Sequence, residues 1–300
     1  MISGHNPPRL SYIGPHSEFG YKSNQIDSYV DILKALLENI KLNMQIDIKI
    51  TCMDISDFKF SPGFYLDVID EESKDVSSLI DEITSLIARE NLRVFFCLSK
   101  EYFLGTQIEG MKKSTTSILL KVSEILDLLG VCGTSILIRI GSAYGNRKET
   151  MSSFCERLES LGNGVISKVC VMNDDKPSLF SITDILSGIY YRMGVPICFR
   201  ILPHQFNNGG LTIREALFLS CSTWRSGEKP IFVYSESQEY DISGMPVSNK
   251  SREYLMNRIP TFGLDLDVIV DSPAREDSCL KYRMDYKSLS PIVINKYNKK

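Results

Sequence analysis

The feature that most constrains the fold of this 300-residue chain is a strict alternation of two hydrophobic patterns. Short apolar runs, rich in β-branched and aromatic residues, alternate with longer segments of helical periodicity. Because the short runs are apolar almost throughout, we expect parallel strands that are buried on both faces. The expected strands are Arg9–Ile13, Asp47–Cys52, Leu92–Cys97, Ser135–Arg139, Lys168–Met172, Pro196–Arg200, Pro230–Tyr234 and Leu264–Val270. The expected helices are Asn24–Asn43, Val76–Glu90, Lys113–Leu129, Lys148–Leu161, Ile182–Met193, Ile213–Thr223, Asn249–Asn257 and Ala274–Asp285.

Eight strand and helix units in this order favour an α/β protein with a single (β/α)8 TIM barrel. The main rival is an open, doubly wound sheet. That rival loses support because no G-x-G-x-x-G follows the first strand and no Walker A motif occurs. We expect one barrel domain over residues 4–289 and a polar C-terminal tail over residues 290–300.

Local signals mark the ends of several expected helices. Ser181 precedes one helix with Asp184 three residues later, and Thr212 precedes another with Glu215 at the same spacing. Both pairs have the spacing of a capping box at a helix N-terminus. Gly130 follows a helical segment and is expected to end it.

Composition excludes several classes of protein. A net charge of −3 and a pI of about 5.8 argue against a broadly basic surface, although a local basic groove stays open. Since no apolar run can span a bilayer and MISGHNPPRL lacks a signal-peptide core, we expect a soluble intracellular protein without membrane contacts. The 8 cysteines include no C-x-x-C pair and the chain has only 3 histidines, which favours reduced, mostly buried thiols over a zinc site.

In a barrel of this kind the functional residues lie at the C-terminal ends of the strands. One expected strand ends at Arg139 and opens into a Gly-rich loop, and the next ends at Met172 before Asn-Asp-Asp. The other polar side chains at these ends include Asp54, Asp57, Ser99, Lys100, Glu101, Tyr102, Arg200, His204, Ser235, Glu236 and Asp271. This set contains carboxylates for a weak Mg²⁺ site, but it is too poor in histidine for a transition-metal cluster.

Several motifs, in a fixed order, carry a resemblance to a known family. They are RIGSAYGNRKET, VMNDDK, GVPICFRILPH, KPIFVYSES, SREYL and LDLDVIVDSPAREDS. The chain resembles the UV-damage endonuclease family of DNA excision repair from LSYIG to about residue 283. The resemblance implies a TIM barrel, UV-damaged duplex DNA as the partner, and metal-dependent hydrolysis of the phosphodiester on the 5′ side of UV photoproducts.

The resemblance also implies where the histidine and carboxylate ligands of the family's metal cluster fall. These positions are Cys97, Val122, Arg139, Met172, Arg200, Pro203, Val233, Ser251 and Asp271. Of these residues, only Asp271 has a side chain of the kind that binds the metal ions in the family. The family's damage-probing pair falls near Lys100 and Glu101, with Tyr102 adjacent.

Losing nearly all ligands abolishes a metal cluster, because each ion needs several donors in fixed geometry. The substitutions therefore predict loss of the cluster and impaired or absent incision. Arg139 and Arg200 predict instead an anion or DNA-phosphate site, to which Lys100 and Tyr102 contribute. The alternative is that both arginines only pair with Asp174, Asp175 or Asp271.

Other interpretations stay open at this stage. A rebuilt nuclease site would use Asp174, Glu236 and Asp271 as catalytic residues with Mg²⁺ or Mn²⁺, whereas no cofactor is expected if activity is lost. As a single residue, Glu236 is better explained as a capping or loop-pairing carboxylate than as a general base. The main alternative function is an inactive barrel that binds damaged DNA, another anion or a protein partner, and sugar-isomerase-like chemistry rests on fold analogy alone.

Overall fold

The computed structural model describes residues 7–15, 17, 25–60, 73–143 and 145–291, and its centre is a nearly closed parallel barrel. The strands follow the order β1, β11, β9, β8, β7, β6, β5, β3 around the barrel, each pairing in parallel with its neighbours. Their bounds are β1 (Arg9–Tyr12), β3 (Ile50–Asp54), β5 (Arg93–Phe103), β6 (Ile136–Arg139), β7 (Val169–Met172), β8 (Ile197–Arg200), β9 (Ile231–Tyr234) and β11 (Asp267–Val270). Each expected strand overlaps one of these, so the predicted (β/α)8 barrel is confirmed.

The barrel closes between β1 and β3 through a few contacts and not through a full ladder. Ile13 forms an isolated parallel bridge with Cys52, and Gly14 N donates to Cys52 O at 2.9 Å. The buried Ser11 hydroxyl donates to Ile50 O at 2.8 Å. These bonds satisfy backbone groups that an open sheet edge would leave unpaired.

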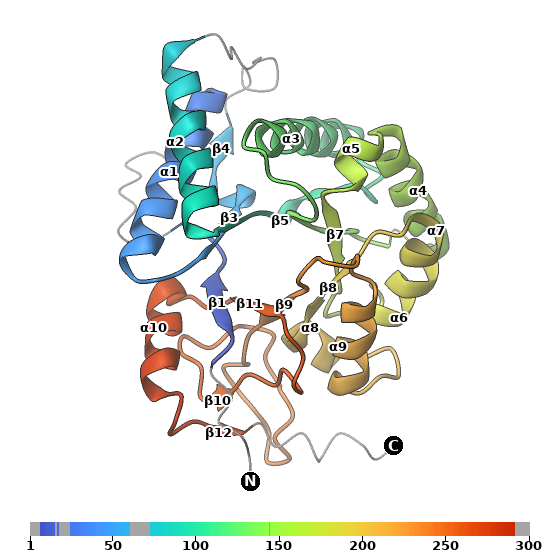
Figure 1. Ribbon diagram of the computed structural model, residues 1–300. Helices are drawn as coiled ribbons and strands as arrows, with labels where there is room; N and C mark the ends of the chain where they lie inside the picture. The colour runs from blue at the N-terminus through green and yellow to red at the C-terminus, as the bar shows by residue number, and fades with distance from the viewer. Residues whose placement is uncertain (1–6, 16, 18–24, 61–72, 144, 292–300) are drawn as a thin grey trace.

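Helices surround the strands on the outside of the barrel (Figure 1). Their bounds are α1 (Tyr29–Gln45), α2 (Lys74–Glu90), α3 (Glu109–Leu128), α4 (Arg147–Ser160), α5 (Asn163–Ile166), α6 (Ile182–Ile185), α7 (Tyr191–Met193), α8 (Ile201–Phe206), α9 (Ile213–Ser222) and α10 (Arg275–Asp285). A 3-10 turn, η1 (Ile55–Asp57), follows β3, and a π-helical turn, η3 (Leu186–Tyr190), joins α6 to α7. The remaining strands are the short pairs β2 (Gln25–Ile26) with β4 (Lys59–Phe60) and β10 (Asn257–Arg258) with β12 (Ser290–Pro291).

The predicted helix ends are confirmed at several points. Ser181 with Asp184 and Thr212 with Glu215 form complete capping boxes, in which side chain and backbone bond reciprocally. Gly130 follows α3 with a φ of +65°, a left-handed conformation that glycine adopts without strain. Residues 290–291 of the predicted tail form β12, and residues 292–300 lie outside the described residues.

The predicted helix over Asn249–Asn257 is wrong. This segment is extended and irregular, with a bridge between Ser251 and Ser237 and the short strand β10 at its end. Its backbone N–H groups bond outside the segment: Arg252 N donates to Glu236 O at 2.7 Å, and Asn257 N donates to the Glu236 carboxylate at 2.9 Å. Tertiary hydrogen bonds thus replace the helical ones that the local pattern favours.

Two apolar clusters fill the protein. The larger lies between the strands and the helices, and the smaller fills the barrel interior. The interior cluster is unusually rich in sulfur, and its members include Cys52, Cys97, Cys170, Cys198 and Met172. No helix among the described residues is long and apolar enough to cross a bilayer.

Candidate functional site

A cavity of about 700 Å³ opens where β3, β6, β7, β8 and β11 end, and we call it the mouth cavity. Its lining consists of Ile13, Asp54, Asp57, Cys97, Arg139, Met172, Arg200, Gln238, Lys250, Ser251, Asp271, Ser272, Pro273 and Arg275. A smaller cavity of about 240 Å³ shares Arg139, Arg200, Ser251 and Asp271 with it. The site therefore lies at the end of the barrel where functional residues were expected.

Arg139, at the end of β6, lines the mouth cavity and is held by a buried carboxylate. Its Nε donates to Oδ1 of Asp174 at 2.8 Å, and its guanidinium lies 5.7 Å from the ring centroid of Phe103. The Asp174 side chain is fully buried, and its Oδ2 has no hydrogen-bond partner among the described residues. Burial raises the pKa of Asp174 although Arg139 opposes the shift. The ion pair therefore fixes the guanidinium at the cavity wall.

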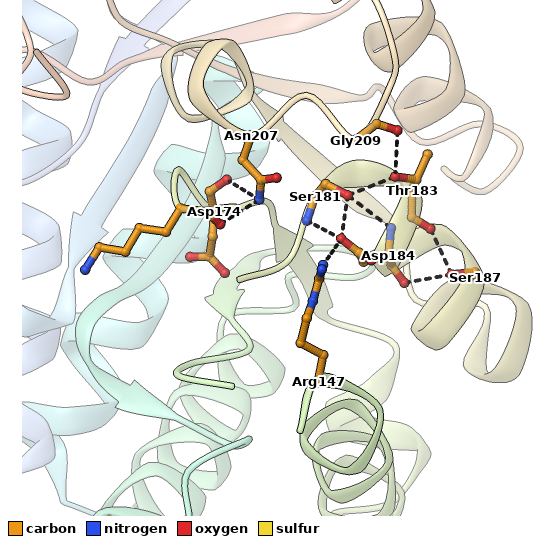
Figure 2. Close-up of polar contacts among 9 residues, drawn as sticks. Arg147, Asp174, Ser181, Thr183, Asp184, Ser187, Asn207 and Gly209 are labelled. Carbon is orange, nitrogen blue, oxygen red and sulfur yellow. Dashed lines mark hydrogen bonds and ion pairs between the residues drawn. The ribbon is translucent and has the colours of Figure 1, made fainter. Parts of the chain in front are cut away.

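Asp174 is held in place by the loop that joins β7 to α6 (Figure 2). Asp174 N donates to Phe180 O at 2.9 Å, and Asn207 Nδ2 donates to Asp174 O at 3.3 Å. The loop ends at Ser181, whose hydroxyl caps α6, and Arg147 pairs with Asp184 on that helix. The capped start of α6 thus fixes the end of the loop that carries the Asp174 carboxylate to Arg139.

Arg200, at the end of β8, is the second cation of the mouth. Its Nη2 lies 3.5 Å from Oδ2 of Asp271, which follows β11. Asn173 fixes the Arg200 backbone, because its Oδ1 accepts from Arg200 N at 2.7 Å and its Nδ2 donates to Arg200 O at 3.1 Å. Among the described residues no acceptor contacts Nε or Nη1 of Arg200. Part of the guanidinium thus keeps unused donors at the cavity.

The structure brings two further cations to the mouth that sequence reasoning missed. Lys250 lies in the segment expected to be helical, and Arg275 begins α10 after β11. Arg275 Nη1 donates to Pro15 O at 2.8 Å, whereas no acceptor among the described residues contacts the Lys250 ammonium. Arg275 follows the last barrel strand closely in the sequence, so its place at the mouth could have been predicted. No local pattern in the sequence indicated that Lys250 would line the cavity.

Cys97 and Met172 line the cavity and are almost fully buried. Burial raises the pKa of the Cys97 thiol well above its usual range, so the thiol stays protonated at neutral pH. A protonated, buried thiol is a poor nucleophile and a poor metal ligand.

The remaining positions expected from the family divide into two groups. Ser251 lines both cavities, and Pro203 lines the smaller one. Val122 lies on α3 in the outer core and Val233 on β9 in the barrel interior, both without exposure at the mouth. Valine has no donor atom for a cation.

Glu236 lies beside the strand ends but is occupied by structural hydrogen bonds. Its carboxylate is 3% exposed and accepts from Tyr234 Oη at 3.0 Å, Asn257 N at 2.9 Å and Met256 N at 3.1 Å. It does not line the mouth cavity. The geometry therefore fits the alternative interpretation of a loop-pairing carboxylate.

Lys100 and Tyr102, expected to contact the anion, lie on β5. The Lys100 side chain is outside the described residues, and Tyr102 is 6% exposed and packs in the outer core. Tyr102 therefore does not present its ring to the mouth.

The residues at the mouth do not fit the metal cluster that the family resemblance implies. Among the described residues no three histidine, cysteine, aspartate or glutamate side chains gather closely enough to hold an ion. Asp271 faces Arg200, and guanidinium groups repel a dication at contact distance. His204 is buried with Nε2 3.1 Å from Leu211 O, and burial lowers its pKa to about 4. The carboxylates that line the mouth cavity are Asp54, Asp57 and Asp271, and with the described histidine His204 bonded elsewhere they do not supply the ligand set of that cluster.

Comparison with known sequences identifies related proteins. A family model described as UV-endonuclease UvdE matches residues 28–297. A putative UV-damage endonuclease of Acanthamoeba polyphaga mimivirus is 20% identical over 228 residues, which cover 74% of this chain and 68% of that protein. A UV DNA damage endonuclease of Bacillus cereus (strain B4264) is 25% identical over 144 residues, 48% of this chain and 44% of that protein. The match thus spans less than half of the Bacillus relative.

Comparison with solved structures gives the same barrel. The crystal structure of SacUVDE matches with a TM-score of 0.73 and 21% identity, covering 94% of this chain and 98% of that one. A D-tagatose 3-epimerase-like protein matches with a TM-score of 0.55 and 11% identity, covering 88% and 96%. At these identities the structural matches establish the fold alone. Because the family match extends over residues 28–297, the chain belongs to the UV-endonuclease UvdE family.

Proposed function

We propose that this chain is a UV-damage-endonuclease-like DNA repair protein that binds UV-damaged duplex DNA at the mouth of its barrel. Family membership supports the class of substrate. The observation that carries the proposal for this chain is the mouth cavity, where Arg139, Arg200, Lys250 and Arg275 converge.

The chemistry of these cations suits a phosphodiester. Nε and Nη1 of Arg200 and the Lys250 ammonium have no acceptor among the described residues, so their donors are available to a phosphate. A guanidinium binds two phosphate oxygens at once, and Lys adds a point charge. Asp174 and Asp271 orient the two arginines without covering them, because the Arg139 and Arg200 side chains stay 24% and 18% exposed.

We further propose that metal-dependent incision is impaired in this chain. The positions where the resemblance implies ligands hold guanidinium, thiol, thioether, hydroxyl and aliphatic groups and a single carboxylate, Asp271, which is the group that suits a hard cation. A rebuilt site of Asp174, Glu236 and Asp271 has little support from the geometry. Two of these carboxylates pair with arginines, and Glu236 accepts backbone hydrogen bonds.

Binding of DNA tests the first part of the proposal. The double variant Arg139→Ala/Arg200→Ala removes two phosphate contacts, so the slope of log affinity against log salt becomes shallower by about two for UV-irradiated duplex DNA. The control is Arg192→Ala/Arg214→Ala, which removes two arginines from the outer helices α7 and α9. A double variant that binds like the wild type at all salt concentrations contradicts phosphate binding at the mouth.

Nicking of UV-irradiated plasmid with added Mn²⁺ or Mg²⁺ tests the second part. We expect no metal-dependent nicks above those of a protein-free control. Nicks that require the metal and disappear in Asp271→Asn contradict impaired incision and favour the rebuilt site.

A further inference from the structure

The segment after β9 forms a hairpin, which we call the mouth hairpin (residues 237–251). Antiparallel bridges join Ser237 to Ser251 and Tyr240 to Pro246. Between them, Gln238 N donates to Lys250 O at 3.0 Å. The Ser237 hydroxyl also donates to Ser248 O across the hairpin at 2.6 Å. The two arms are therefore held together along their length.

The tip of the mouth hairpin is a closed turn. Oδ1 of Asp241 accepts from Ser243 N and Met245 N, each at 2.8 Å. Gly244 has a φ of +76°, and its N donates to Asp241 O at 3.0 Å. An aspartate that bonds the turn backbone and a left-handed glycine are the usual means of closing a short hairpin loop. The side chain between them, Ile242, is thus presented by an ordered backbone.

Large apolar side chains are concentrated on and next to this hairpin. Ile242 is 105% exposed, more than any other large apolar side chain among the described residues. Of the 10 exposed large apolar side chains in the described part of the chain, 5 lie within residues 240–256. They are Tyr240, Ile242, Met245, Val247 and Met256. Isolated exposed apolar residues are normal, whereas this concentration on one short segment suits an interaction site.

The foot of the mouth hairpin is part of the mouth cavity. Gln238, Lys250 and Ser251 line it, and Asn249 Nδ2 donates to Asp175 at 2.9 Å. Ile242 is four residues beyond Gln238, which limits its reach from the cavity lining to at most about 13 Å of extended chain. That reach corresponds to about four base pairs of B-DNA. A duplex that places a phosphate in the cavity and runs along the hairpin therefore extends past the tip.

The charge of the tip distinguishes its role from that of the cavity. Residues 239–247 contain Glu239 and Asp241 and no lysine or arginine, so the tip offers no cation to a phosphate. DNA-binding proteins that distort the duplex insert apolar side chains such as Ile or Met between base pairs. Unstacking costs least at a damaged base, which makes such insertion selective for lesions.

We propose that Ile242 is a wedge that enters the base stack at the lesion, while the mouth cavity holds the backbone. This inference rests on the proposed function, because it requires DNA at the mouth. It adds a damage-sensing residue on a segment far in sequence from β5. Ile242 acts by occupying space between bases and not by charge.

The test compares Ile242→Ala with Met284→Ala, which removes an 81% exposed apolar side chain from α10. The probe is a duplex with one thymine photodimer and an adjacent 2-aminopurine, whose fluorescence rises on unstacking. We expect Ile242→Ala to lower affinity for this duplex about tenfold, with the salt slope unchanged, because only stacking interactions are lost. The 2-aminopurine signal rises with the wild type, Ile242→Leu and Met284→Ala, but not with Ile242→Ala.

The other possible results separate failure of the wedge from failure of the proposed function. If Ile242→Ala binds and brightens the probe like the wild type, the wedge is overturned while DNA binding at the mouth stands. If the wild type binds neither damaged nor intact duplex, the proposed function fails and the wedge with it. If Ile242→Ala changes only self-association in sedimentation, the tip binds a second copy of the chain and the wedge is overturned.

Discussion

At the scale of single residues, Asp267 connects three cations at the end of the barrel opposite the mouth. Its fully buried carboxylate accepts from Arg93 at 2.7 Å and Arg9 at 2.9 Å, and Lys229 Nζ lies 3.2 Å away. Burial alone raises the pKa of Asp267, but the hydrogen bonds from Arg9 and Arg93 outweigh burial, so that the pKa lies below its ordinary value.

We therefore predict that Asp267 stabilises the protein above pH of about 4 and that this contribution is lost as pH falls through its lowered pKa. Asp267→Asn lowers the free energy of unfolding at neutral pH by about 2–3 kcal/mol, less than for a fully buried pair because the cations are partly exposed. Urea denaturation of both proteins at neutral and acid pH measures this. Equal acid sensitivity of the two proteins contradicts the prediction.

Gly209 lies at a position where the structure has no room for a side chain. It has a φ of +58°, and a Cβ there would lie 2.6 Å from Oγ of Ser181 and also meet Thr183, next to the loop that anchors Asp174 (Figure 2). Neighbouring Gly210 has a φ of +85° but open space around it.

Gly209→Ala and Gly210→Ala form a matched pair, because both introduce backbone strain and only the first adds a clash. We predict that Gly209→Ala lowers the free energy of unfolding by about 1–2 kcal/mol more than Gly210→Ala. Thermal or urea denaturation gives the difference. Equal losses contradict the close packing of this loop against α6.

The residues of the mouth were predictable only in part. Arg139, Arg200 and Asp271 follow apolar strands directly, so their positions were evident once the barrel was inferred. The sequence did not indicate which of the candidate carboxylates pairs with Arg139. Asp174 is positioned by hydrogen bonds from residues distant in the sequence, such as Asn207. Lys250 reaches the cavity through the mouth hairpin, whose last residues belong to the segment that was expected to be helical.

At the scale of elements, the alternating pattern predicted every strand of the barrel, because apolar runs buried on both faces differ clearly from amphipathic helices. It failed over Asn249–Asn257, where the local pattern is helical but the backbone is extended. The difference arises from Glu236, a residue on another segment that binds Met256 N and Asn257 N. Such tertiary bonds cannot be read from local periodicity.

We predict that Glu236→Ala destabilises the protein by about 3 kcal/mol, because it leaves the buried Tyr234 hydroxyl and the partly buried N–H groups of Met256 and Asn257 without an acceptor. Glu236→Gln keeps an acceptor and costs about 1 kcal/mol. Urea denaturation measures both. A loss of DNA nicking in Glu236→Gln without loss of stability would instead favour Glu236 as a catalytic base.

At the scale of the whole molecule, the barrel follows the family, whereas the groups at its mouth differ from the metal ligands that the resemblance implies. The barrel matches the fold of SacUVDE over 94% of this chain. The strand ends at the mouth carry Arg139 and Arg200, which stand where the resemblance to the family implies metal ligands. Packing between strands and helices does not depend on those side chains, so the fold tolerates their exchange.

The measurement that tests this account most directly is the metal content of the purified protein after equilibration with Mn²⁺ and removal of excess ion, read by elemental analysis. The chain should retain no stoichiometric manganese, and Asp271→Asn should give the same reading as the wild type. Two or three manganese ions retained per chain, and released by Asp271→Asn, would contradict the claim that its mouth binds anions in place of a metal cluster.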